Sequence, residues 1–386
     1  MYIRKKIYYT HHMINLDYAS HTPVDVRVLA EFCRVEREYP GNVMAAHAMG
    51  KKARAEMERV TCGIASLLDI KPQEIIFTSG ASEANNLAIK GIAKAYQHVG
   101  KHILSTCLEH PSVSGTLSAL AQQGYEIELL KILPDGTIDF EHLRTAIRRD
   151  TVLMCVSAVD SELGAIQPIA EITEILKVHP HCHLHIDAAQ AIGKIPADIT
   201  GASTFCFSPH KFYGLCGVGV LVKREGVVLE PLIHGGASTT IYRSGTPALS
   251  LAAASYTALD LAFKEMDERL KIVRLLRKYV LDAISAYPLV RINSPQTGSP
   301  YILNISVKGV KGTDFQAALD RYGICVSVKS ACSTDRAPSR PVMAVTGDKK
   351  IALCSWRISL SHLTTMQEID TFLDAFDNCY KEFTAK

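Results

Sequence analysis

An acidic residue and a lysine follow two apolar runs in the segment HIDAAQAIGKIPADITGASTFCFSPHKFYG, residues 185–214. Asp187 ends the first run, and Lys211 comes 24 positions later, just after the second run. Short apolar runs rich in β-branched and aromatic residues predict buried strands. Burying a charge is unfavourable unless the charge is paired, so the two residues mark a candidate site.

A carboxylate at the end of a parallel strand can hold a proton on a heteroaromatic nitrogen, because a low-dielectric ion pair favours the charged forms of both partners. Pyridoxal phosphate needs such a partner for its ring nitrogen, and it also needs a lysine that forms a Schiff base. Asp187 and Lys211 are candidates for these two roles. Taken alone, however, a lysine in this position is more often a surface residue after a turn.

A phosphate group would need its own site, and TSGASEANN, residues 78–86, follows a predicted strand and opens a predicted helix. The chain turns at Gly80, and the backbone N–H groups of Ala81 and Ser82 at the helix N-terminus would attract an anion. The same S-G-x-S-E pattern is also an ordinary capping box. Both interpretations stay open for this segment alone.

The elements that position these residues alternate between strands and helices from about residue 70 to 225. Seven runs predict strands: EIIFTS (74–79), KHILST (101–106), YEIELL (125–130), TVLMCVS (151–157), HLHIDA (183–188), TFCFS (204–208) and GVGVLV (217–222). Mostly helical connections predict an α/β fold whose largely parallel sheet is buried on both faces. Ligands bind such sheets at the carboxyl ends of the strands, where Asp187 and Lys211 stand.

The pattern changes after residue 250, where apolar residues at helical spacings from Leu259 to Ile284 predict one long linking helix. A smaller α+β unit follows, with strands at 301–307 and 354–360, a helix near 312–322, and a last helix with Ile369, Phe372, Leu373, Phe376 and Tyr380 on one face. The 386 residues also exceed the roughly 250–300 at which one core stops growing. We therefore predict a large cofactor-binding domain, residues 15–255, and a small domain made of residues 1–14 and 256–386.

Composition excludes several classes of protein. The 42 basic and 39 acidic residues are scattered and give a formal charge of +3, so no nucleic-acid partner is predicted. Eleven widely spaced cysteines without a C-x-x-C pair are typical of reduced thiols in a cytoplasm. No apolar run reaches the roughly 18–20 residues of a membrane span, and the first residues lack the apolar core of a secretory signal. We expect a soluble cytoplasmic protein.

A row of histidines, HPHCHLH at 179–185, suggests a metal site, because His181, His183 and His185 share one face of a strand around Cys182. Strand periodicity alone produces that alignment, and no second pair of ligands is evident. No metal site is predicted.

Nine segments occur together in an order that is typical of one enzyme family: L-D-Y-A (16–19), G-N-x-x-x-x-H-x-x-G (41–50), F-T-S-G-A-S-E-x-N-N-L-A-I (77–89), E-H (109–110), H-I-D-A-A-Q (185–190), S-x-H-K-x-Y-G (208–214), R-S-G-T (243–246), S-A-C (330–332) and R-I-S-L (357–360). The chain resembles the cysteine desulfurases, which are pyridoxal-phosphate-dependent enzymes of fold type I in the class V aminotransferase superfamily. The resemblance extends from about residue 15 to 380, nearly the whole chain.

The resemblance implies a role for each matching residue around the cofactor. Lys211 would carry pyridoxal phosphate as a Schiff base, Asp187 would pair with its ring nitrogen, and His110 would stack on the ring and relay protons. The phosphate contacts would come from Ala81, Ser82, Ser208 and His210, and from Thr246 of the partner subunit in a homodimer. Gln190 would donate a hydrogen bond to the phenolic oxygen of the cofactor, near Ser161.

The resemblance also implies how the substrate, L-cysteine, is held. Arg357 would receive its carboxylate, a role that suits the planar fork of a guanidinium, and Asn42 would assist. Cys332, in the loop KSACSTDRAPSRP (329–341), would take the sulfur as a persulfide. The loop is polar and contains proline, so it can expose the thiol, and the nearby cations Lys329 and Arg336 would favour the thiolate.

Three positions depart from the family pattern. Ser161 stands where an asparagine is typical, Pro209 replaces a small residue and removes a backbone donor, and Val328-Lys329 stands where Thr-Gly is common. The implied reaction converts L-cysteine to L-alanine and delivers persulfide sulfur to an acceptor in iron–sulfur cluster assembly or tRNA thiolation. There are three alternatives. The chain could be a selenocysteine lyase, another class V aminotransferase-type enzyme, or a non-catalytic scaffold partner whose active site has drifted.

Overall fold

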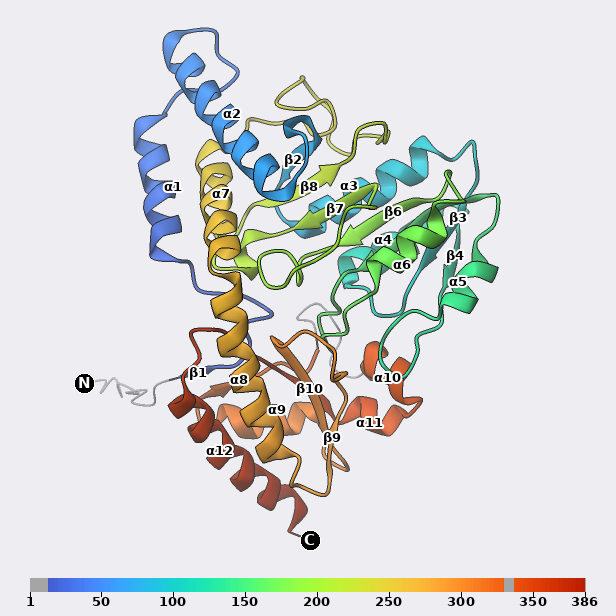
Figure 1. The fold of residues 1–386 in the computed structure, drawn as a ribbon, viewed down its shortest axis with the longest axis vertical. Coiled ribbons are helices and arrows are strands. Elements are labelled where there is room, and N and C mark those ends of the chain that lie inside the picture. The colour runs from blue at the N-terminus through green and yellow to red at the C-terminus, as the bar shows by residue number, and fades with distance from the viewer. Residues whose placement is uncertain (1–12, 330–336, 386) are drawn as a thin grey trace, which may run out of the picture.

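The computed structural model describes residues 13–329 and 337–385. These residues form a large unit and a small unit, which are joined by helices α7 (Leu249–Lys264) and α8 (Met266–Ile284) running from one to the other (Figure 1). Within the described residues, no helix is both long enough and apolar enough to span a membrane.

A seven-stranded sheet forms the centre of the large unit. Its strand order is β2-β8-β7-β6-β5-β3-β4. The strands are β2 (Ile75–Thr78), β3 (His102–Ser105), β4 (Glu126–Leu129), β5 (Thr151–Ser157), β6 (His183–Asp187), β7 (Thr204–Phe207) and β8 (Gly219–Lys223). Only β8 runs antiparallel to its neighbours, β2 and β7. All seven predicted strands and the mostly parallel sheet are therefore confirmed.

Both faces of this sheet are buried, as the sequence pattern predicts. Strand β7 sends Phe205 and Phe207 into one apolar core and Cys206 into another. The helices of this unit are α1 (Val26–Glu38), α2 (Ala48–Leu68), α3 (Ala81–Ala95), α4 (Pro111–Ala121), α5 (Phe140–Ala146) and α6 (Ile169–Leu176), with short 3-10 turns η1 (Pro72–Glu74) and η2 (Pro209–Lys211). Helix α3 crosses one face of the sheet and begins where β2 ends.

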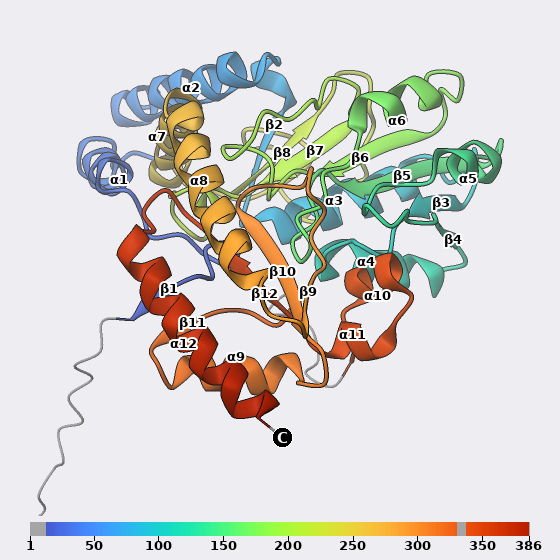
Figure 2. The ribbon, with the colours of Figure 1, turned by 60° about the horizontal axis from the view of Figure 1, so that its bottom comes forward.

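The small unit is built on an antiparallel sheet with the order β12-β10-β9. Its elements are β9 (Val290–Ile292), β10 (Ile302–Val307), α9 (Gly312–Asp320), β11 (Ile324–Cys325), α10 (Arg340–Thr346), α11 (Lys349–Leu353), β12 (Ser355–Ser359) and α12 (Met366–Thr384). Helices α9 and α12 lie on the side of this sheet that faces away from the large sheet (Figure 2). Near the N-terminus, β1 (Ile14–Asn15) pairs in parallel with β11.

The predicted single linking helix is wrong in one respect, because the chain leaves helical geometry at Glu265, with φ −103° and ψ 5°. The carboxylate of this residue accepts a hydrogen bond from Arg27 of α1 at 2.7 Å and one from Arg269 of α8 at 2.7 Å. Helix α7 packs on α1 and α2, whereas α8 packs on α12. The predicted domain boundary at residue 255 falls inside α7 and stays a prediction.

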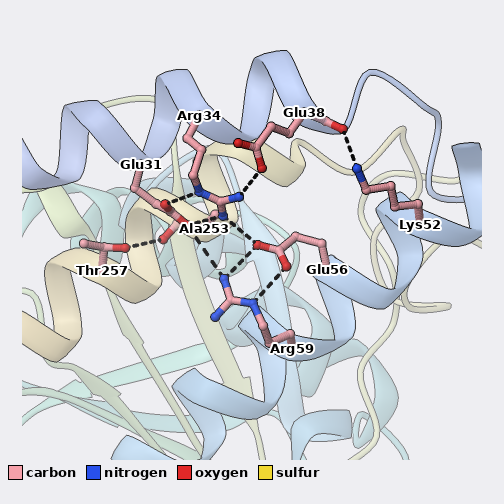
Figure 3. A network of polar contacts seen from close by, with 8 residues as sticks. All are labelled: Glu31, Arg34, Glu38, Lys52, Glu56, Arg59, Ala253 and Thr257. Carbon is pink, nitrogen blue, oxygen red and sulfur yellow. Dashed lines mark hydrogen bonds and ion pairs between the residues drawn. The ribbon is translucent and has the colours of Figure 1, made fainter.

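An ion-pair network fastens α1 to α2 beside α7 (Figure 3). The buried Glu56 of α2 accepts from Arg34 of α1 at 3.0 Å and from Arg59 at 2.7 Å. Arg34 also binds Glu31 and Glu38 on its own helix. The arginines, Arg59 above all, hold the pKa of Glu56 below its usual range. The network therefore fixes the position of the helix pair that covers one edge of the large unit.

Candidate active site

A cavity of about 370 Å³ opens at the carboxyl ends of β5, β6 and β7. Most of the predicted site residues line it: Ala81, Ser82, His110, Ser161, Asp187, Gln190, Ser208, His210, Lys211 and Arg357. Arg357 reaches the cavity from β12 of the small unit, and the other residues come from the large unit. The cavity therefore lies between the two units.

Asp187 ends β6 and is only 6% exposed. Its Oδ2 accepts from Asn85 Nδ2 at 2.8 Å, and its Oδ1 accepts from the Ala189 N–H at 3.0 Å. Asn85 is fully buried on α3, and its amide orients the carboxylate toward the cavity side of the sheet. Sequence reasoning did not single out Asn85, although it lies inside the quoted T-S-G-A-S-E-x-N-N segment.

Lys211 ends η2, directly after β7. Its Nζ donates to the carbonyl oxygens of Ala19 at 2.9 Å and Ser20 at 2.7 Å. Burial, reinforced by the charge of Arg357, lowers the pKa of Lys211 to about 8. A larger fraction of this amine is therefore unprotonated near neutral pH than in an ordinary lysine, as a nucleophile or a base requires.

The N-terminus of α3 forms another part of the cavity wall. The Ala81 N–H donates to Ser208 Oγ at 2.7 Å, which ties the start of α3 to the end of β7. Gly219 of β8 packs so closely on Gly80 that a Cβ at residue 219 would lie 2.4 Å from a backbone atom of Gly80. The helix N-terminus and the serine hydroxyl together give the cavity a polar end suited to an anion.

The capping-box interpretation of this segment is realised only in part. Glu83 Oε2 accepts from the Ser79 N–H at 2.7 Å, as in a capping box. The N-cap residue, however, is Gly80, which has no side chain to return a hydrogen bond to the helix. Glu83 also pairs with Arg243 at 3.0 Å.

Two histidines line the cavity near the lysine. His110 is the N-cap of α4, and its Nδ1 accepts from the Ser112 N–H at 3.1 Å. His210 stacks on His21 with ring centroids 5.6 Å apart. Burial lowers the pKa of His110 and lowers that of His210 to about 4, so both rings are neutral near pH 7.

Arg357 is 2% exposed and already has several partners. Its Nη1 donates to the Ser161 carbonyl at 2.7 Å, and its Nη2 donates to Asp17 Oδ1 at 2.6 Å and Ser20 Oγ at 2.9 Å. Its buried Nε has no acceptor among the described residues. The guanidinium thus retains donor capacity that this part of the chain does not use.

A buried lysine that sequence reasoning missed, Lys194, contacts Gln190 of the cavity wall. Lys194 Nζ donates to Gln190 Oε1 at 2.7 Å, and Gln190 Nε2 donates to the Ala19 carbonyl at 2.9 Å. Burial lowers the pKa of Lys194 well below its ordinary value. The carbonyl of Ala19 therefore receives hydrogen bonds from both Gln190 and Lys211.

The comparisons with known proteins agree with this arrangement. The family model described as aminotransferase class-V matches residues 14–372. The chain belongs to the aminotransferase class-V family. It is similar to the "NifS/IcsS protein homolog" of Lactobacillus delbrueckii subsp. bulgaricus, with 34% identity over 96% of this chain and 98% of the relative. It is also similar to "Cysteine desulfurase IscS" of Neisseria meningitidis serogroup C, with 37% identity over 92% of this chain and 89% of the relative.

Solved structures extend the comparison to the fold. A structure described as a "NIFS-LIKE PROTEIN" superposes with a TM-score of 0.89 and 32% identity, and the match covers 95% of this chain and 99% of that one. The predicted family and fold type are therefore confirmed. The curated relatives are matched over nearly their whole length, so the family assignment applies to both units.

The cavity of this class-V family member fits pyridoxal phosphate. One partly buried lysine, one buried carboxylate and a helix N-terminus surround a single space, and the serine hydroxyl of Ser208 is fixed at its polar end. These are the groups that the aldehyde, the ring nitrogen and the phosphate of that cofactor require. The two departures at this wall, Ser161 and Pro209, leave all of them in place.

Three predicted residues are not brought to the cavity by the described chain. Asn42 is exposed between α1 and α2, where its Oδ1 accepts from the Met44 N–H at 2.9 Å. Thr246 lines a separate cavity of about 170 Å³ that shares Ser79 with the first. Cys332 lies outside the described residues.

The described ends of the Cys332 segment nevertheless lie beside the active-site cavity. Lys329 and Ala337 line a cavity of about 290 Å³, together with His110 and Ser161. Ser339 Oγ, at the N-cap of α10, donates to Glu162 Oε2 at 2.6 Å. The large unit therefore anchors the described residues that follow the segment.

Two histidines of the row are held by contacts with helix α3 and strand β7. His185 is fully buried, and its two ring nitrogens lie 2.8 Å from Asn85 Oδ1 and 2.8 Å from Thr204 Oγ1. His183 packs against Tyr96 with ring centroids 4.2 Å apart. His185 thus supports Asn85, and through it Asp187.

Proposed function

We propose that this class-V family member is a pyridoxal-phosphate-dependent cysteine desulfurase that converts L-cysteine to L-alanine and transfers the sulfur to Cys332. The observation that carries the proposal is the placement of Lys211, Asp187 and Arg357 around one cavity. The names of the relatives, among them "Cysteine desulfurase IscS", support cysteine as the substrate.

Pyridoxal phosphate, when bound, supplies an electron sink for the negative charge that develops at the substrate α-carbon. Asp187 provides the fixed negative charge that keeps a proton on the ring nitrogen, and Asn85 holds that carboxylate in place. Lys211, with its pKa lowered to about 8, removes the α-proton as a neutral amine. Ala81, Ser82, Ser208 and His210 hold the phosphate end.

The substrate is oriented by Arg357, whose guanidinium binds the α-carboxylate, and Asn42 assists it. The Cys332 thiolate then attacks the substrate sulfur. The carbon–sulfur bond breaks with its electron pair left on carbon, a sulfur–sulfur bond forms, and the carbon takes a proton to become alanine. One cysteine and one enzyme thiol thus give one alanine and one persulfide.

The enzyme works as a homodimer in the cytoplasm, and Thr246 of each subunit contacts the phosphate bound by the other. The persulfide passes to an acceptor protein in iron–sulfur cluster assembly or tRNA thiolation. The named desulfurase relatives and the position of Thr246 in a cavity that shares Ser79 with the active site support these assignments.

The test is a product assay on cofactor-loaded protein given L-cysteine. Wild type should form alanine with a reductant present, and mass spectrometry without it should show one added sulfur atom on Cys332. Cys332→Ser should lose both products, whereas Cys62→Ser, which changes an exposed cysteine on α2, should behave as wild type. Equal sulfide and alanine from Cys332→Ser, or no visible cofactor absorbance in wild type, would overturn the proposal.

A further inference from the structure

A continuous chain of hydrogen bonds connects Asp187 with His110. Asn85 Nδ2 lies 2.8 Å from Asp187 Oδ2 and 2.8 Å from Ser112 Oγ. Ser112 Oγ lies 2.8 Å from His110 Nδ1. We infer that this chain fixes His110 as the neutral tautomer with its hydrogen on Nε2, which makes Asn85 and Ser112 positioning residues for the proposed desulfurase reaction.

Asn85 sets the direction in which hydrogen bonds are donated along this series of side chains. An ionised carboxylate only accepts hydrogen bonds, so the side of the Asn85 amide that faces Asp187 must be the NH₂ group. The opposite side agrees, because Oδ1 lies 2.8 Å from His185 Nε2 and 2.9 Å from Cys206 Sγ, both of which can donate. The amide is therefore held in one orientation by partners on both sides.

Ser112 in turn donates its hydroxyl hydrogen to His110. Its Oγ accepts from Asn85 Nδ2, so its single hydroxyl hydrogen is free to point at the acceptor 2.8 Å away, His110 Nδ1. The Ser112 N–H donates to the same Nδ1 at 3.1 Å. A ring nitrogen that accepts two hydrogen bonds carries no hydrogen, so the hydrogen of the neutral ring is on Nε2.

The charged groups that act on His110 oppose each other. Asp187 favours its protonated form, Lys211 disfavours it, and burial, which is the largest effect, lowers the pKa of His110. The ring is therefore neutral near pH 7. Its Nε2 has no hydrogen-bond partner among the described residues, and the ring lines the active-site cavity.

The consequence is that His110 offers the cavity a hydrogen-bond donor and not a base. A proton removed from the substrate then goes to Lys211, because the resting histidine has no free acceptor nitrogen. This separation of roles deepens the proposed function, on which it rests. The proton relay predicted for His110 is thereby limited to the donation of its Nε2 hydrogen to a group in the cavity.

The test is nuclear magnetic resonance of the cofactor-loaded protein labelled with ¹⁵N in its histidines, because the shifts of ring nitrogens distinguish N–H from bare nitrogen. His110→Gln identifies the signal. Wild type should show Nε2–H with Nδ1 bare and remain neutral down to acidic pH. Ser112→Ala loses a donor to Nδ1, so the pKa of His110 should rise by about one unit.

Two further variants keep the test decisive. Ser112→Thr retains the hydroxyl and should restore the wild-type titration, and Ser118→Ala on the exposed side of α4 should leave it unchanged. An Nδ1–H signal in wild type, or a Ser112→Ala protein that titrates as wild type, would overturn the inference. Because the spectra need no turnover, a protein that makes no alanine can still show the tautomer, and the two failures are separable.

Discussion

Arg357 Nη2 lies 2.6 Å from Asp17 Oδ1, so the guanidinium proposed to bind the substrate carboxylate is already paired with a carboxylate of the protein. Ser20 Oγ accepts from the same nitrogen at 2.9 Å. Asp17 therefore holds Arg357 in place and also reduces the positive charge that the substrate meets.

Replacing Asp17→Asn should lower the KM for L-cysteine by about 3- to 10-fold. The amide keeps an acceptor oxygen for Nη2 but no longer neutralises Arg357, so the substrate carboxylate binds more tightly, by about 1 kcal/mol. Steady-state kinetics would check this. Ser20→Ala removes the other Nη2 partner without a change of charge and should leave KM close to wild type, whereas a higher KM in Asp17→Asn would contradict the prediction.

The rate at which Lys211 condenses with added pyridoxal phosphate should rise with pH and level off above about 8. The reason is that only the neutral amine reacts, and the pKa of Lys211 is lowered to about 8. Arg357→Met removes a neighbouring positive charge, which makes protonated Lys211 less unfavourable and moves its pKa upward. The midpoint of the pH profile, followed by visible absorbance, should therefore shift to higher pH. An unchanged midpoint would show that burial alone sets it.

Lys194→Met should alter the bound cofactor without weakening the fold. Replacing a buried amine by an apolar side chain of similar length removes the cost of burying a polar group, so the melting temperature should not fall. The loss of the donor to Gln190 Oε1 frees the amide to turn, and the pH titration of the cofactor absorbance should shift. If Lys194 acts through Gln190, the double variant Lys194→Met/Gln190→Leu should show no shift beyond that of Gln190→Leu. An additive shift would refute the coupling.

Stability should fall as pH rises through neutrality because of Glu109. This carboxyl is buried, accepts from Thr106 Oγ1 and Ser157 Oγ at 2.7 Å each, and has its pKa raised by burial from 4.5 to about 7. A raised pKa means that the folded protein binds the proton more tightly. The stabilisation is complete below about pH 4.5 and is lost as the pH passes through about 7.

Glu109→Gln should therefore flatten the pH dependence. Between about pH 5 and 8 the wild type should lose on the order of 2 kcal/mol through this group, and the variant should not. Urea unfolding at both pH values measures the difference, with the exposed Glu141→Gln as the control. Parallel pH profiles for wild type and Glu109→Gln would count against the assignment.

Gly219→Ala should weaken cofactor binding. The new Cβ would lie 2.4 Å from a backbone atom of Gly80, so the start of α3 and β8 cannot both keep their positions, and the contact between Ala81 and Ser208 is disturbed. We expect a loss of stability of about 1–3 kcal/mol and a lower affinity for pyridoxal phosphate. Gly226→Ala, where a Cβ would meet no atom within 4 Å but φ is +85°, controls for the loss of a glycine. If Gly219→Ala left the affinity for pyridoxal phosphate unchanged, the packing of Gly219 on Gly80 would not be needed for the phosphate site.

The sheet and much of the cavity could be predicted because the signals are local. Strand β6 is a short, largely buried strand that ends in Asp187, and η2 brings Lys211 directly after β7. The break at Glu265 has no local signal in the sequence, and Arg27, which donates to the Glu265 carboxylate, is more than 200 positions away. The apolar spacing continues through this residue and therefore indicates one helix.

Contacts between distant segments account for most of what sequence reasoning missed. Asn85 and Ser112 look like ordinary polar residues on helices, and their importance depends on hydrogen bonds between segments far apart in the sequence. Lys194 looks like an ordinary lysine in a turn; its bond to Gln190 is local, and only its burial in the fold distinguishes it. Asn42 and Thr246 were predicted by resemblance, and the described chain leaves them away from the cavity. The roles proposed for them would need a second subunit or a movement, neither of which a single sequence can show.

The short N-terminal strand β1 has a practical consequence for how this protein can be divided. It pairs with β11 of the small unit, and the residues that follow supply acceptors for Lys211 at Ala19 and for Arg357 at Asp17. An expressed large unit without β11 would lose the anchor of this segment, and an isolated small unit would lose the counter-charge of its arginine. Neither fragment contains a complete set of walls for the proposed cofactor, so fragment complementation would have to restore residues 14–20 to their place before any colour or turnover returned.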